Sequence, residues 1–145
     1  MSGPQNPVLV CSQWRLLCFH KQGTSARTRF VRWPHGMLAF APLPAEAMPA
    51  EPSALMIRPH ATVLREAASR LGVANADLRV ETDFVAAFAA ASGTIDIYLL
   101  QFATLDPPFE AVAAQGGKFV AITETRDCDP RELQLLRQAY EIIIG

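Results

Sequence analysis

Acidic side chains follow two segments that the sequence predicts to be strands. Asp106 comes after the strand expected over residues 94–103, whereas Glu124 and Asp127 belong to the end of the strand expected over 118–125 and the loop beyond it. A helix between two strands predicts a βαβ unit, whose parallel strands end at the same edge. Carboxylates at that edge could hold Mg²⁺ or act as acid and base. The structural alternative is that Asp106 caps a helix and that the other two are solvated.

Asp96 lies inside an otherwise apolar segment, and Tyr98 shares its face because strand side chains alternate. A buried carboxylate needs a partner or a shifted pKa, so this pair could point into a ligand pocket. Asp96 could equally lie in water at the rim of the sheet.

Histidine and cysteine side chains could in principle form a metal site. The four candidates in the first part of the chain are Cys11, Cys18, His20 and His35. Their spacing does not match the close pairs of zinc sites, so we expect no metal. Cys128 precedes the beginning of a helix, where a thiol can be reactive. With no histidine nearby in the sequence, an inert cysteine is the alternative, and we expect no cofactor.

The segment LREAASRLGVANADL, residues 64–78, resembles the first helix and turn of a helix-turn-helix. The positions that carry the resemblance are Ala68, Gly72, Val73 and Leu78. It implies a DNA-binding module, which we keep as a second alternative. The would-be recognition helix holds three acidic side chains and one basic one (Asp77, Glu81, Asp83; Arg79). A phosphate backbone repels that charge, so a nucleic-acid partner is not expected.

The elements that would position these residues are inferred from periodicity and capping signals. We expect helices over 59–71, 82–92, 106–116 and 129–144, clear strands over 94–103 and 118–125, and a possible strand over 78–82. The sequence therefore predicts an α/β fold: a small sandwich of two or three strands containing one βαβ unit, flanked by about four helices. An α+β fold is the alternative.

A change in composition near residue 55 predicts a domain boundary. Residues 1–50 carry five basic side chains and one acidic one, and most prolines precede residue 53. We interpret residues 1–55 as a disordered or non-native extension and linker, with Met48 or Met56 as the true start, or as a targeting segment. Residues 56–145 are then one globular domain.

Apolar side chains exceed what so small a sheet could cover, and such a surplus indicates an interface. The expected interface residues are Phe84, Phe88, Tyr140, Ile143 and Ile144. We therefore expect an accessory or protein-interaction domain without catalytic activity that associates with itself or a protein partner. The first alternative is an enzyme domain that binds a ligand or metal through the acidic edge. No apolar run reaches the ~18 residues of a membrane span, and three cysteines suit the cytoplasm.

Overall fold

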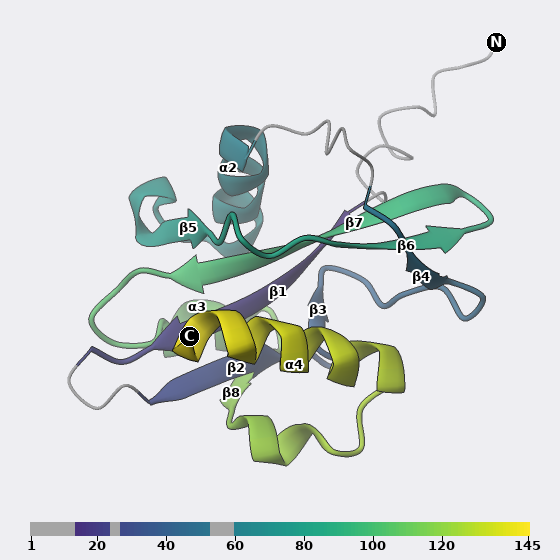
Figure 1. Cartoon of the computed structure of the whole chain (residues 1–145). Helices are drawn as coiled ribbons and strands as arrows, with labels where there is room; N and C mark the ends of the chain where they lie inside the picture. The colour runs from purple at the N-terminus through teal and green to yellow at the C-terminus, as the bar shows by residue number, and fades with distance from the viewer. Residues whose placement is uncertain (1–13, 24–26, 53–59) are drawn as a thin grey trace, which may run out of the picture.

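The computed structural model of the chain describes residues 14–23, 27–52 and 60–145. Eight strands of the described residues form one mixed sheet, with three α-helices (Figure 1). The strands are β1 (Trp14–Lys21), β2 (Thr28–Arg32), β3 (Leu38–Ala39), β4 (Met48–Ala50), β5 (Leu78–Val80), β6 (Ala86–Ala90), β7 (Gly93–Phe102) and β8 (Lys118–Val120). The helices are α2 (His60–Leu71), α3 (Phe109–Ala114) and α4 (Pro130–Ile144), and the 3₁₀ turns are η1 (Asn75–Asp77) and η2 (Ile122–Thr125).

The two longest strands, β1 and β7, form the centre of the sheet. They run parallel, in a register that pairs Trp14 with Asp96 and Phe19 with Gln101. Every residue of β1 except Lys21 is buried. A strand that is buried on both faces is typical of a sheet covered by helices on each side.

Shorter strands extend the sheet outward from this central pair. β2 and β3 pair with successive parts of β1, and β5 and β6 pair with successive parts of β7, all antiparallel. The order across the sheet is β4-β6-β7-β1-β2-β8. The strands at the two ends of this order have three residues each, and β4 contains Pro49, which suits an edge because proline lacks an N–H.

Helices cover the two faces of the sheet (Figure 1). On one face, α2 buries an apolar stripe (Val63, Ala67, Ala68 and Leu71) against alternate residues of β1 and β7 such as Leu16 and Leu100. On the other face, Leu135, Leu136 and Ala139 of α4 pack against the intervening residues of the same two strands, such as Leu17 and Leu99. The alternation of side chains along each strand therefore divides the core into two layers.

Several expected elements are confirmed by the structure. The helix expected over 59–71 is α2, and it ends at Gly72, whose φ of 72° is easy only for glycine. The strand expected over 94–103 is β7, and the possible strand over 78–82 is β5. The last helix begins as expected, because Asp129 accepts a hydrogen bond from the N–H of Arg131 and Pro130 opens the first turn.

The predicted fold class was wrong. Within the described residues the sheet has eight strands rather than two or three, and the α-helices number three rather than about four. The segment expected to be a buried helix over 82–92 contains β6, which turns back on β7 as a hairpin. A short run of phenylalanine and alanine with no polar positions gives no period, so periodicity could not separate strand from helix.

The expected βαβ unit is also corrected. β7 and β8 do run in the same direction, but β1 and β2 lie between them in the sheet. β8 ends at Val120, and residues 122–125 form the turn η2 instead of continuing the strand. The two carboxyl ends therefore lie at the same end of the sheet without being neighbours.

The composition change near residue 55 does not separate an extension from a folded unit. Residues 14–50 contribute β1 to β4, and β1 pairs directly with β7 at the centre of the sheet. Residues 1–13 and 53–59, Met56 among them, lie outside the described residues. The high proline content made this part of the chain look like a linker. In the structure the prolines of residues 14–50 lie in the turns that follow β2 and β3 and in the edge strand β4.

The helix-turn-helix resemblance does not extend to the structure. After α2 the chain forms the turn η1 and the strand β5, which pairs with β7. The segment that would have been the recognition helix is therefore part of the sheet. No helix within the described ranges is long and apolar enough to cross a membrane.

Candidate functional site

The carboxylates of the three acidic residues expected at one edge have different partners. Asp127 forms a two-point ion pair with Arg32 of β2, with Nη1–Oδ1 and Nη2–Oδ2 distances of 3.0 and 2.8 Å. Glu124 accepts a hydrogen bond at 2.8 Å from the N–H of Ala121 and so closes its own turn. Asp106 lies exposed in the loop after β7. No group of three His, Cys, Asp or Glu side chains that could hold a metal ion occurs among the described residues.

Asp96 and Tyr98 lie on the same face of β7, as alternation predicted. Tyr98 is fully buried under α2, where its ring meets the ring of His60 edge-on at 5.9 Å. Asp96 is half-buried beside Trp14. The structure brings these two residues together and keeps them apart from Asp106, Glu124 and Asp127.

The histidine and cysteine candidates do not form a described cluster. Cys11 lies outside the described residues, and burial raises the pKa of Cys18 to about 12. His20 is buried and its Nε2 is 2.8 Å from the carbonyl oxygen of Thr104. Burial raises the pKa of Cys128, which favours the thiol over the reactive thiolate.

Most of the expected interface residues belong to the core. Phe84 and Phe88 are buried in the layer beneath α4, and Tyr140 and Ile143 are partly buried against the same layer. Ile144, 60% exposed, is the member of this set that faces solvent. The surplus of apolar surface therefore disappears, because the larger sheet provides the area that covers it.

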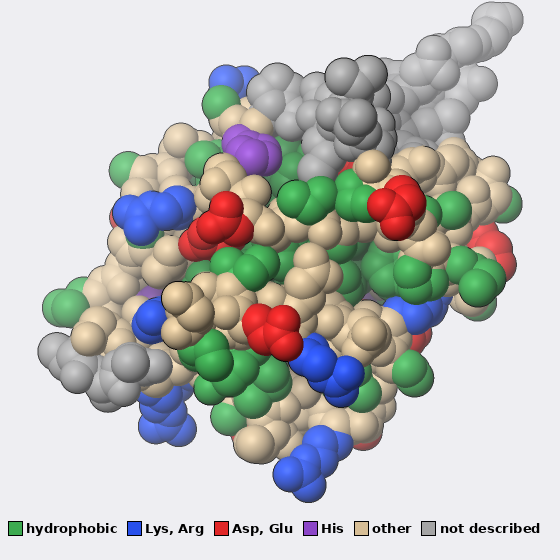
Figure 2. Space-filling model, in the orientation of Figure 1, with side chains coloured by type: hydrophobic (Ala, Val, Ile, Leu, Met, Phe, Trp, Pro, Cys, Tyr) green, Lys and Arg blue, Asp and Glu red, His purple; other side chains and the backbone are tan. Residues whose placement is uncertain are grey.

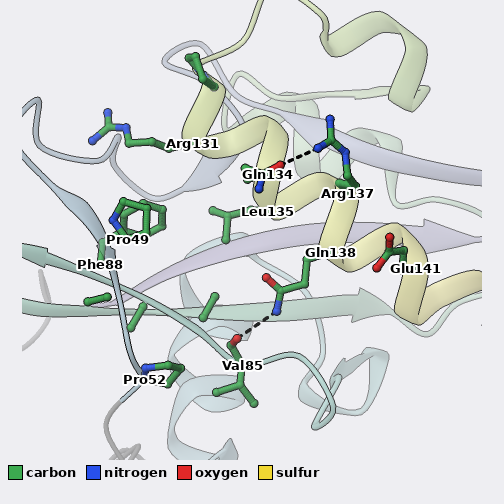
Figure 3. Close-up of a pocket in the computed structure, with 14 residues that line it drawn as sticks. Pro49, Pro52, Val85, Phe88, Arg131, Gln134, Leu135, Arg137, Gln138 and Glu141 are labelled. Atoms are coloured by element: carbon green, nitrogen blue, oxygen red, sulfur yellow. Dashed lines mark hydrogen bonds between the residues drawn. The ribbon is translucent and has the colours of Figure 1, made fainter.

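A groove lies between α4 and the edge of the sheet formed by β4 and β6 (Figure 3), and we refer to it as the α4 groove. It has a volume of about 570 Å³, within the range of small-molecule sites. Its apolar lining comprises Pro49, Ala50, Pro52, Val85, Ala86, Ala87, Phe88, Pro130 and Leu135. Its polar lining, all from α4, comprises Arg131, Gln134, Arg137, Gln138 and Glu141. Figure 2 shows hydrophobic side chains on this side of the molecule, with charged side chains around them.

One end of the groove is fixed by Arg131. Its guanidinium pairs with Asp129 at 2.6 Å and donates to the carbonyl oxygens of Pro44 and Ala47 at 2.9 and 2.8 Å. The hydrogen bond from Arg131 lowers the pKa of Asp129. Arg131 therefore holds α4 against the loop that precedes β4, and its donors are occupied by the protein itself.

The other polar side chains lie along α4 at helical spacing. Gln138 donates from Nε2 to the carbonyl oxygen of Val85 at 3.0 Å and so connects α4 to the segment leading into β6 (Figure 3). Arg137 donates from Nη1 to Oε1 of Gln134 at 2.7 Å. Glu141 follows Arg137 by four residues, which places both on one side of the helix. An exposed guanidinium and a carboxylate therefore flank an apolar floor.

Sequence reasoning missed this site. The spacing Gln134, Arg137, Gln138 and Glu141 was visible, but polar residues at helical spacing are typical of any solvated face. Only the position of β6 and β4 beside α4 turns these residues into the wall of a groove. Since β6 was expected to be a helix, that position could not be foreseen.

Comparison with known proteins finds a similar structure but no similar sequence. No family model matches the sequence, and no curated protein matches it. A solved structure described as the crystal structure of C. elegans Ap4A hydrolase matches with a TM-score of 0.55 and 12% sequence identity. The match covers 90% of this chain and 96% of that chain. The chain therefore shares the fold of that structure over most of its length.

This finding corrects the expectation of an accessory domain without catalytic activity. That expectation rested on a small sandwich with surplus apolar surface and without a site. The structure instead covers Phe84 and Phe88 with its own helix, and the same architecture occurs in an enzyme. Self-association is therefore no longer needed to explain these apolar residues, because the core of the chain itself buries them.

Proposed function

We propose that the chain is a hydrolase that acts on the phosphate chain of a nucleotide-type substrate bound in the α4 groove. The observation that carries the proposal is the exposed guanidinium of Arg137 beside a large apolar floor. A nucleotide combines a flat ring with anionic phosphates, and this groove offers a surface for each. The fold shared with an Ap4A hydrolase supports the choice of reaction.

The substrate would use the two sides of the groove differently. Its ring would lie on the floor formed by Phe88, Ala86 and Leu135, which is apolar and close-packed. Its phosphates would meet Arg137, because Arg131 already pairs with Asp129. The amide of Gln134 would orient the Arg137 guanidinium through the existing hydrogen bond.

The reaction needs a water molecule that attacks phosphorus while the bond to the leaving phosphate breaks. In this proposal the Glu141 carboxylate takes the proton of the attacking water, and the leaving phosphate departs as an anion. Arg137 donates hydrogen bonds to the phosphoryl oxygens, where negative charge gathers. A divalent ion held by three protein ligands does not fit the donor set of the described residues, so no step is assigned to one.

The test is turnover of diadenosine tetraphosphate by the full chain, with products separated by anion-exchange chromatography. Glu141→Gln should lower kcat about a hundredfold with little change in KM, because it removes the base. Arg137→Ala should raise KM and lower kcat, each by about tenfold, because it removes a contact to the phosphates and to the charge that gathers on them during the reaction. Glu110→Gln and Arg65→Ala are matched controls, because both exposed residues lie on helices α3 and α2 at the opposite face of the sheet.

Two results would overturn the proposal. The first is that diadenosine tetraphosphate and ATP remain intact and cause no change in the amide NMR spectrum of the protein. The second is cleavage that Glu141→Gln and Arg137→Ala leave at the rate of the controls, since the activity would then belong to another part of the chain.

A further inference from the structure

We infer that a second, smaller pocket on the α2 face binds a small oxyanion, either a carboxylate or a phosphoryl group. The pocket is lined by Trp33, His35, Phe40, Arg70 and Gln115 and has a volume of about 160 Å³. We refer to it as the Trp33 pocket. It is too small for a nucleotide and does not depend on the function proposed for the α4 groove.

The charge of the pocket comes from Arg70, an exposed residue near the end of α2. Its guanidinium carbon lies 4.0 Å from the centre of the Phe40 ring, a cation–π contact that positions the side chain without using its N–H donors. No ion pair of Arg70 exists within the described part of the chain. The guanidinium therefore keeps both its charge and its hydrogen-bond donors for a ligand.

None of the remaining lining side chains is acidic. Gln115 contributes an amide at the end of α3, whereas His35 donates from its Nε2 to the carbonyl oxygen of Leu38 at 2.6 Å and so uses that donor within the protein. The indole Nε1 of Trp33 is buried and has no hydrogen-bond partner among the described residues. Buried donors are rarely left unpaired in proteins. An excess of donors over acceptors is what a ligand with anionic oxygen atoms requires.

The walls of the pocket are rigid enough to preserve this arrangement. Trp33 is only 4% exposed, and a Cβ atom at Gly117 would lie 2.8 Å from Cε3 of its ring. The indole therefore packs directly on the backbone of the loop after α3. Phe40 in turn meets Trp14 edge-on at 6.1 Å. A preformed cavity loses little freedom when a ligand enters, which favours binding of even a small anion.

The experiment is a titration of the full chain, labelled with ¹⁵N, with inorganic phosphate and with acetate at constant ionic strength. Saturable shifts are expected at the Trp33 indole N–H and at the backbone amides of Arg70 and Gln115. The indole signals are easily assigned, because the chain has only two tryptophans. Saturation by phosphate alone would identify a phosphoryl site, and saturation by acetate alone a carboxylate site.

The matched variants are Arg70→Gln and Arg65→Gln, which remove one exposed positive charge each from the same helix. Arg70→Gln should weaken the apparent affinity about tenfold, and Arg65→Gln should leave it unchanged. The proposal is overturned if neither anion gives saturable shifts, or if both variants weaken binding equally. Because Arg137→Ala changes only the α4 groove, its effect separates failure of this pocket from failure of the proposed hydrolase.

Discussion

The carboxylate of Glu132 accepts a hydrogen bond from the backbone N–H of Met37, with an Oε1–N distance of 3.1 Å. Glu132 is on α4 and is 5% exposed, and Met37 lies in the segment that leads into β3. This hydrogen bond connects α4 to a segment on the other side of the composition change near residue 55.

Burial raises the pKa of Glu132, partly offset by the hydrogen bond from Met37 and by the charge of His35. A carboxyl group with a raised pKa binds protons more tightly in the folded state. Its contribution to the free energy of unfolding is therefore largest below the ordinary pKa of 4.5 and falls as pH rises through the folded-state value. Glu132→Gln keeps an acceptor for Met37 but cannot titrate, so urea unfolding should show a smaller loss of stability between acidic and neutral pH. An unchanged pH profile would contradict this prediction.

Glu132→Ala should behave differently from Glu132→Gln. Alanine leaves the N–H of Met37 buried without an acceptor, which costs about 1–3 kcal/mol of unfolding free energy. Urea denaturation at neutral pH measures the difference between the two variants. Equal stability of the two would show that the hydrogen bond contributes nothing.

Gly36→Ala should destabilise the protein by about 1–3 kcal/mol. The φ of Gly36 is 139°, and a Cβ atom there would lie 2.8 Å from Oε2 of Glu132. The added methyl group would meet both backbone strain and a buried carboxylate. Gly23→Ala is the control, because no atom lies within 4 Å of its Cβ position. Thermal unfolding of both variants tests the prediction, which fails if their Tm values fall equally.

Arg32→Gln should raise the pKa of Asp127. The hydrogen bonds from Arg32 hold that pKa at about 2, below the ordinary 3.8. A lowered pKa means that the ion pair contributes to stability above pH 3.8 and that this contribution is lost as pH falls toward about 2. A carboxyl ¹³C titration should show the Asp127 midpoint move toward 3.8 in the variant. The Asp129 midpoint, set by Arg131, should stay where it is.

Residues 56–145 expressed alone should not fold cooperatively. They lack β1, and without it one long side of β7 has no partner and Leu99 and Leu100 lose much of their cover. An amide NMR spectrum of the fragment should be poorly dispersed, whereas the full chain should give a dispersed one. A dispersed spectrum of the fragment would contradict the central position of β1.

The elements that the sequence predicted correctly are those whose local signals agree with their tertiary role. α2 has an amphipathic stripe and a terminal glycine, and α4 has Asp129 and Pro130 at its beginning. β7 is rich in β-branched and aromatic residues, a pattern that few helices show. For these elements, local preference and packing point to the same structure.

The remaining elements depend on contacts between distant parts of the chain. β1 holds only a short apolar run between Arg15 and His20, beside basic, proline-containing segments, and it becomes recognisable as a strand only when β7 pairs with it. β6 consists of alanine and phenylalanine and becomes a strand through its hairpin with β7. The α4 groove needs β6 and β4 in place, so missing those strands also meant missing the site.

The two edges of the sheet carry a consequence for the protein at high concentration. β4 and β8 have three residues each, with Pro49 in the middle of the first and Lys118 at the start of the second. Long, regular edges invite strands from other molecules to join the hydrogen-bond ladder. β4 and β8 offer few backbone donors, and β8 adds a charged side chain, so a strand from another molecule has little opportunity to pair with either of them.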